Sequence, residues 1–142
     1  MDITFEVLGK PQGKARVKVT QRNGFALAYT PDKTTNYENL IKLCYMNCKP
    51  HGDLTHEPIS MTIRADYEIP KSFSKKKQIE ALSGKLRPRT KPDLDNIAKI
   101  VCDALNKVAY YDDNQVIDLH VTKFYSNQPK LVIRLKEVKD EN

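Results

Sequence analysis

The chain has 142 residues, of which 39% are hydrophobic and 30% are charged, and its formal net charge is +6. This length and composition predict one globular domain that spans residues 1–142. No apolar run approaches the roughly 20 residues of a transmembrane helix, and the first residues lack the basic and apolar blocks of a signal peptide. We therefore expect a cytoplasmic protein with no membrane partner.

The positive charge is concentrated in two segments. Residues 10–22 hold five basic and no acidic side chains, and residues 71–91 hold eight basic side chains and one acidic. Their combined charge of +12 leaves −6 for the rest of the chain. Two such segments favour a nucleic acid as the partner over the alternative that lysine-rich loops only keep the protein soluble. The residues expected to bind DNA are Lys10, Lys14, Arg16, Lys18, Lys75, Lys76, Lys77, Lys85, Arg87, Arg89 and Lys91.

Apolar periodicity predicts the elements of the first half of the chain. Alternation of apolar and polar residues predicts strands at residues 3–7 and 25–29. Helical spacing then predicts a helix at residues 34–49, and a long alternating run predicts a strand at residues 59–69, which Pro70 ends.

The second half begins with a basic stretch in which a short helix is expected at residues 76–82. A longer helix begins at Asp93, a favourable N-cap, and extends to about residue 108. The strands expected at residues 117–121 and 131–135 are joined by a turn and are predicted to form an antiparallel hairpin. The order β-β-α-β-α-β-β predicts an α/β fold, or an α+β fold, in which two main helices pack on a mixed sheet.

The cysteines and histidines carry no predicted chemistry. Cys44, Cys48 and Cys102 have no paired spacing, which argues against a disulfide framework and against a zinc site. Helical periodicity places Cys44 and Cys48 on the buried stripe of their helix, so we expect buried thiols. The three histidines do not cluster with any cysteine, and no phosphate-binding loop or nucleotide fingerprint is present.

Two acidic pairs are the candidates for chemistry. Asp93 and Asp95 flank Leu94 at a helix start, so both carboxylates point away from the core. Asp112 and Asp113 precede the next strand and are within reach of the helix start if that strand runs beside it. Four converging carboxylates without thiolate or imidazole suit Mg²⁺, or Mn²⁺, rather than zinc.

Metal beside a basic surface indicates phosphoryl chemistry, because divalent ions activate water and stabilise the leaving oxygen. Lys99, one turn after Asp95, is positioned to neutralise phosphate charge or to orient the water. An alternative explains each residue by structure: Asp93 as an N-cap, Asp95 and Lys99 as an i,i+4 pair, and Asp112 and Asp113 as a turn. Asp103, over two turns beyond Asp95, is expected to be structural.

The motif residues resemble the RusA family of Holliday junction resolvases, which are often encoded by prophages. The residues that carry the resemblance are Asp93-Leu94-Asp95-Asn96, Lys99, Asp103-Ala104-Leu105, Asp112-Asp113, Gln115-Val116 and Asp118. The resemblance implies a homodimeric, magnesium-dependent endonuclease that makes paired nicks in four-way DNA junctions during recombination and repair. Asp93, Asp95 and Asp113 match the metal-binding carboxylates of the family, Lys99 matches its catalytic lysine, and Asp112 is a neighbouring candidate ligand.

The chain departs from the best-known members at three points. Pro92 stands where a basic residue precedes the first aspartate, the chain has no tryptophan, and its basic loop before the motif is longer. Two rival functions stay open: a catalytically inert DNA-binding module, and a nuclease that acts on flaps or single strands. Carboxylates beside a polyanion favour a nuclease, because they repel DNA unless metal intervenes.

Overall fold

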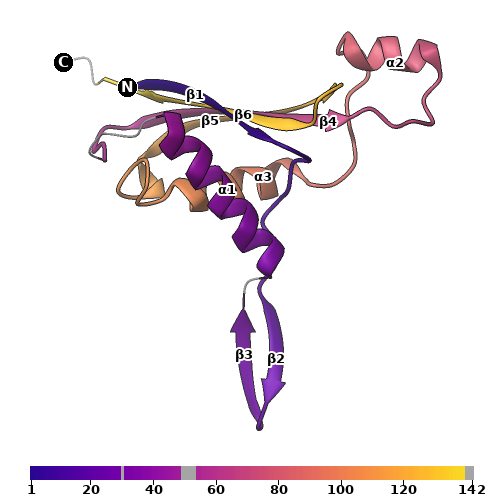
Figure 1. Cartoon of the computed structure of the whole chain (residues 1–142). Coiled ribbons are helices and arrows are strands. Elements are labelled where there is room, and N and C mark those ends of the chain that lie inside the picture. Colours follow the sequence, from indigo (N-terminus) through magenta and orange to yellow (C-terminus); the bar gives the residue numbers. More distant parts are fainter. Residues whose placement is uncertain (30, 49–53, 140–142) are drawn as a thin grey trace.

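The computed structural model of the protein describes residues 1–29, 31–48 and 54–139. The elements in these residues follow the predicted order, with one additional strand, β2, and a short 3-10 helix, η1, and α2 is the short helix expected at residues 76–82 (Figure 1). Their bounds are β1 Asp2–Leu8, β2 Lys18–Arg22, β3 Phe25–Tyr29, α1 Asp32–Cys48, β4 Ile59–Glu68, α2 Lys75–Leu82, α3 Leu94–Leu105, η1 Asp113–Gln115, β5 Val116–Ser126 and β6 Lys130–Glu137.

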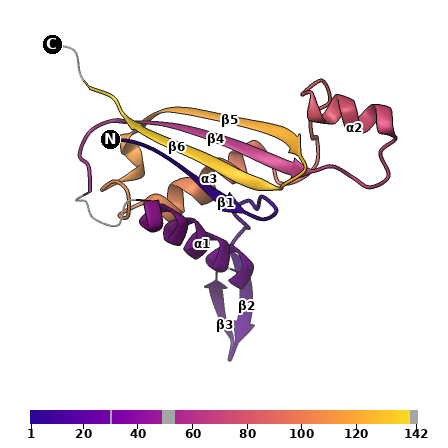
Figure 2. The ribbon, with the colours of Figure 1, turned by 45° about the horizontal axis from the view of Figure 1, so that its top comes forward.

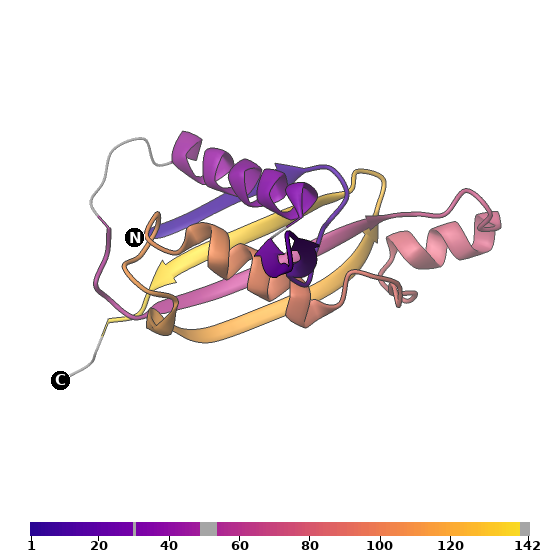
Figure 3. The same ribbon diagram turned by 90° about the horizontal axis from the view of Figure 1, so that it is seen from below.

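The main sheet has the strand order β1-β6-β4-β5 (Figure 2). Only β4 and β5 pair in parallel, and the other pairs are antiparallel. Helices α1 and α3 lie on one face of this sheet, as the view from below shows (Figure 3). The predicted mixed α/β architecture is therefore confirmed.

The core lies between the sheet and these two helices. Strand β4 alternates as its sequence predicts, so Ile59, Met61, Ile63 and Ala65 are fully buried. The helical face that packs on them includes Ile97, Ile100, Val101, Ala104 and Leu105 of α3. No helix in the described residues is long and apolar enough to cross a membrane.

The predicted hairpin of the two last strands is wrong. Strand β6 pairs with β1 and β4, whereas β5 pairs with β4 alone, so β4 separates the two strands. Burial explains the difference: Leu131, Ile133 and Leu135 are fully buried, as in a central strand, whereas Ile117 and Leu119 are exposed on an edge strand. The turn at residues 126–129 indicated only that the chain reverses.

Two further expectations need correction. The first basic segment contains strand β2, which forms a separate two-stranded sheet with β3. This β2–β3 arm projects from the body of the molecule (Figure 1). Cys48 is exposed rather than buried, because the buried stripe of α1 runs through Tyr37, Ile41 and Tyr45. Cys44 and Cys102 are half-buried.

Candidate nucleic-acid groove and carboxylates

A groove with a volume of about 910 Å³ lies where the first basic segment meets the starts of α1 and α3. Six cationic side chains line it: Lys10, Lys14, Arg16, Lys18, Lys33 and Lys91. Asp93 is the only acid among the lining residues described. The groove therefore joins cations that are far apart in the sequence beside one predicted metal ligand.

Gly13 allows the basic segment to form a wall of this groove. The backbone N–H of Lys14 donates to the carbonyl oxygen of Asn96 in α3 over 3.0 Å. A Cβ atom on Gly13 would lie 2.8 Å from the Cβ of Asn96 and 3.0 Å from the Cβ of Pro92. Only a residue without a side chain permits this approach, which brings Lys10 and Arg16 to the start of α3.

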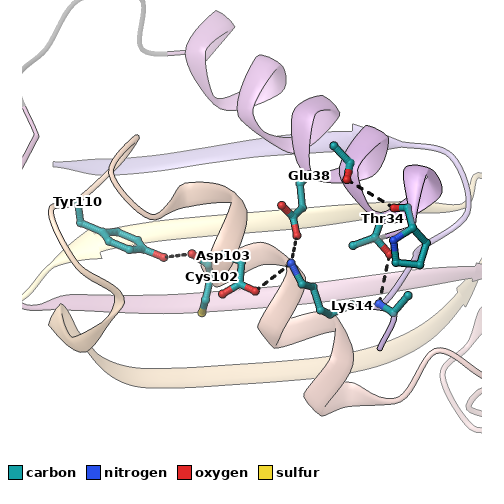
Figure 4. A network of polar contacts seen from close by, with 9 residues as sticks. Lys14, Thr34, Glu38, Cys102, Asp103 and Tyr110 are labelled. Carbon is teal, nitrogen blue, oxygen red and sulfur yellow. Dashed lines mark hydrogen bonds and ion pairs between the residues drawn. The ribbon is translucent and has the colours of Figure 1, made fainter. Parts of the chain in front are cut away.

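Lys14 has a different environment from the one its segment suggested. Its ammonium group donates to Glu38 of α1 and forms an ion pair of 3.3 Å with Asp103 of α3 (Figure 4). The three side chains are only 18%, 17% and 31% exposed. Burial opposes the charge of Lys14, but the hydrogen bonds to Glu38 and Asp103 prevail and raise its pKa. Lys14 thus ties three segments together, and Asp103 takes a structural role.

The start of α3 leaves its acids without the partners that a structural role requires. Asp93 has the extended backbone of an N-cap, with φ −74° and ψ 156°, but its side chain accepts no capping hydrogen bond. Asp95 and Lys99 are exposed, and in the part of the chain that the structure describes neither forms an ion pair. The N-cap and i,i+4 alternatives therefore do not account for Asp93, Asp95 or Lys99.

The second acidic pair divides into two roles. Asp112 caps η1: its carboxylate accepts from the N–H of Asn114 over 3.0 Å, and the backbone N–H of Asp112 donates to the side-chain oxygen of Gln115. The hydrogen bond from Asn114 lowers the pKa of Asp112. A hydrogen bond to the Asp112 side chain raises the pKa of Asp113, while the charge of Lys99 opposes that rise. Asp112 therefore fits the turn alternative, and Asp113 lies in the field of Lys99.

The four carboxylates do not form one cluster. Among residues 1–29, 31–48 and 54–139, no group of three or more His, Cys, Asp or Glu side chains is close enough to hold a metal ion. Asp93 lies near Tyr67, whose pKa rises to about 12 through burial and then through the charge of Asp93. Asp113 instead has Asp112, Asp103 and Lys99 as charged neighbours. The two acidic pairs lie at different ends of α3.

These residues still suit magnesium. Mg²⁺ is usually held by one or two carboxylates and completes its coordination shell with water and substrate phosphates. Asp93 and Asp95 provide two exposed carboxylates next to a groove that suits a phosphate chain. Their assignment as metal ligands, with Asp113, stays a prediction.

The second basic segment lies elsewhere. Lys75, Lys76 and Lys77 are exposed on α2, which stands apart from α1 and the β2–β3 arm (Figure 1) and contributes no residue to the groove lining. Lys85 and Arg89 are exposed on the chain that returns from α2, and Lys91 reaches the groove. Sequence reasoning missed Lys33 and Glu38. Lys33 lies outside both basic segments, and a partner such as Glu38, 24 residues from Lys14, leaves no signal in the local pattern.

Comparison with known proteins gives two matches. A family profile described as Endodeoxyribonuclease RusA matches residues 9–136. The chain is also 41% identical over 138 residues to the Uncharacterized protein YqaN of Bacillus subtilis (strain 168), and the match covers 96% of each sequence. Both matches include the groove, α3 and both acidic pairs.

Proposed function

The chain belongs to the RusA family of endodeoxyribonucleases, and we propose that it is a magnesium-dependent enzyme that resolves Holliday junctions by paired nicks in DNA recombination and repair. The observation that carries this proposal is the position of Asp93. Its carboxylate lines a cationic groove and accepts no capping hydrogen bond. Such a carboxylate lowers the affinity of a protein that only binds DNA, because it repels the phosphates. A metal-dependent nuclease needs it as a metal ligand.

The proposal assigns roles to the groove residues and to charged side chains along α3. Asp93 and Asp95 would hold Mg²⁺ or Mn²⁺, which when bound supplies an activated water and stabilises the leaving oxygen. Asp113, toward the other end of α3, would join them as a ligand only after a shift of the η1 turn toward them. Lys99 neutralises charge on the phosphate, as a rotatable ammonium group can. Lys10, Arg16 and Lys91 hold the DNA backbone along the groove. Asp112 supports Asp113 through the η1 turn.

Resolution of a four-way junction calls for two active sites, and so for a homodimer. The β2–β3 arm offers the interface, because its apolar side chains have no core to enter. Val19 is 67% and Phe25 72% exposed, and Leu27 and Tyr29 are about half exposed. Large exposed apolar patches mark protein contacts. Phe25→Glu with Leu27→Glu should give a monomer in sedimentation velocity, whereas Ile79→Glu on α2 should leave the dimer intact.

The main experiment compares labelled four-way, three-way, flap and linear DNA with and without magnesium. The wild-type protein should cut the four-way junction only with metal. Asp93→Asn should abolish cleavage but keep binding, because it removes a ligand and no phosphate contact. Asp32→Asn is the matched control, since Asp32 also begins a helix and is exposed.

Each other outcome contradicts part of the proposal. If Asp93→Asn cleaved within about tenfold of wild type, a difference of only about 1.4 kcal/mol, Asp93 would not be a metal ligand. Cleavage of flaps in preference to junctions would establish a nuclease of another specificity. Binding without cleavage of any substrate would establish the inert DNA-binding module.

A further inference from the structure

The open face of the sheet, opposite α1 and α3, carries an arrangement of two arginines around one aromatic ring. The guanidinium carbon of Arg64 lies 4.4 Å from the centre of the Phe124 ring, and that of Arg87 lies 3.6 Å from it. Because both distances run to the same point, the two guanidinium carbons are no more than 8.0 Å apart. Two positive charges are thus held together on a face that no described helix covers (Figures 1 and 2).

Both guanidinium groups are fixed through their Nε atoms. Nε of Arg64 donates to Asp66 over 2.8 Å, and Asp66 is only 2% exposed. Nε of Arg87 donates to the backbone carbonyl of Lys123. Within the described residues, the Nη atoms of neither arginine have a hydrogen-bond partner. The stacking on Phe124 and the hydrogen bonds of the Nε atoms orient both guanidinium groups. Their Nη atoms can therefore donate hydrogen bonds to a ligand.

The local charge is positive. Asp66 is the only acid that pairs with either arginine among the described residues, so the three side chains together carry one net positive charge. Two other cations on this face are already paired: Arg134 donates two hydrogen bonds to Asp2, and Lys130 pairs with Glu6. An oriented guanidinium fork matches the oxygens of a phosphate, which makes a phosphate group the fitting ligand.

We propose that Arg64 and Arg87, stacked on Phe124, form a second binding site for the phosphodiester backbone of DNA. This inference rests on the proposed function, because it presumes a DNA substrate. A short stretch of chain connects the site to the groove: after Arg87 the chain passes Thr90, whose carbonyl accepts from Lys123, and reaches Lys91 in the groove wall. A four-way junction has additional duplex arms, one of which can contact this face of the sheet. A short duplex bound in the groove does not extend to it.

The test is the salt dependence of binding to a four-way junction, measured by fluorescence anisotropy in EDTA. Arg64→Gln with Arg87→Gln should lower the slope of log affinity against log salt by about 1.8, or about 0.9 for each lost contact. Arg134→Gln with Lys130→Gln is the control, because it removes the same charge from the same face at positions that are already paired with Asp2 and Glu6. This control should change the slope by less than about 0.5.

Further arms separate binding from structure. Arg64→Lys with Arg87→Lys should keep the slope, since both charges stay, and binding of a short duplex should be the same in all variants. An unchanged slope in the glutamine pair, or a loss equal to that of the control pair, would overturn the second site. The proposed function would survive that result as long as the wild type still cut the junction with magnesium. Failure of the wild type to bind DNA would overturn both.

Discussion

The two basic segments look alike in sequence but have different structures. Residues 10–22 and residues 71–91 are both rich in lysine and nearly free of acids. The first packs against α3 through Gly13 and buries most of Lys14 between two carboxylates. The second extends away from the sheet as α2, in which Ala81 is the only buried residue described. Two segments of similar composition are therefore attached to the fold in different ways.

The two segments differ in the tertiary contacts that they make with the rest of the fold. The first has a glycine where α3 comes close and a lysine that reaches Glu38 and Asp103, so its position is determined by tertiary contacts. In the second, Lys75, Lys76 and Lys77 point to solvent from a helix that contacts mainly β5. The first segment should govern both stability and catalysis, and the second should govern only the attraction of DNA.

The largest expected effect is on folding, and it belongs to the first segment. Lys14→Met leaves Glu38 and Asp103 without their cation in a mostly buried site, which should lower the free energy of unfolding by about 2–3 kcal/mol at neutral pH. Lys76→Met, on the exposed face of α2, should change it by less than about 0.5 kcal/mol. Urea unfolding followed by circular dichroism measures both values.

The pH dependence of this difference has a definite sign. The folded protein raises the pKa of Lys14 above the ordinary 10.5, so the stabilisation is complete below pH 10.5 and is lost as the pH rises through the raised pKa. On the alkaline side, the gap in unfolding free energy between wild type and Lys14→Met should narrow as the pH rises through that pKa. If Lys14→Met and Lys76→Met had the same free energy of unfolding at pH 7, the ion pairs of Lys14 would not stabilise the fold and the contrast between the two segments would be wrong.

A somewhat smaller effect is expected from the glycines of the two segments. Gly13→Ala places a Cβ atom within 2.8 Å of Asn96 and should cost about 2 kcal/mol through overpacking. Gly84→Ala, at φ +83° with its nearest atom 3.8 Å away, should cost about 1 kcal/mol through backbone strain alone. Because Gly13 sets the groove wall beside Asp93, its variant should also cut junctions more slowly at temperatures where it is fully folded.

These expectations are tested by measuring thermal unfolding and junction cleavage for both Gly13→Ala and Gly84→Ala. A Gly13→Ala protein with wild-type stability and wild-type cleavage would mean that the segment moves aside without loss. The close approach of Gly13 to α3 would then not be needed for the shape of the groove or for cleavage.

Local periodicity predicted most of the fold. The buried alternation of β4 and the apolar face of α3 are properties of neighbouring residues, so the sequence displays them directly. The position of β6 between β1 and β4 depends on pairing between distant strands, which no local pattern encodes. For the same reason the turn before β6 suggested a hairpin that the fold does not contain.

The candidate site was predicted in part. The exposed acids at the start of α3 follow from their spacing around Leu94, which the helix period determines. The partners of Lys14 and the stacking of Arg64 and Arg87 on Phe124 join residues from different elements, so composition gave no sign of them. Charge alone placed Lys14 and Arg87 in one class, whereas the structure gives the two side chains different contacts.

The smallest effect on folding, and the one that tests the second segment directly, comes from removing the cations of α2. Lys75→Ala, Lys76→Ala and Lys77→Ala together should leave the unfolding free energy within about 0.5 kcal/mol of wild type, because all three side chains are exposed. If each lysine contacts a phosphate, the slope of log affinity against log salt should fall by about 2.7. A triple alanine variant at Lys42, Lys130 and Lys136, outside both basic segments, removes the same charge and should change that slope far less.

An unchanged slope in the α2 variant would show that this helix faces away from DNA. The groove would then account for the binding that remains, because Lys10 and Arg16 of the first segment and Lys91 at the end of the second keep their places beside Asp93 whether or not α2 touches the substrate.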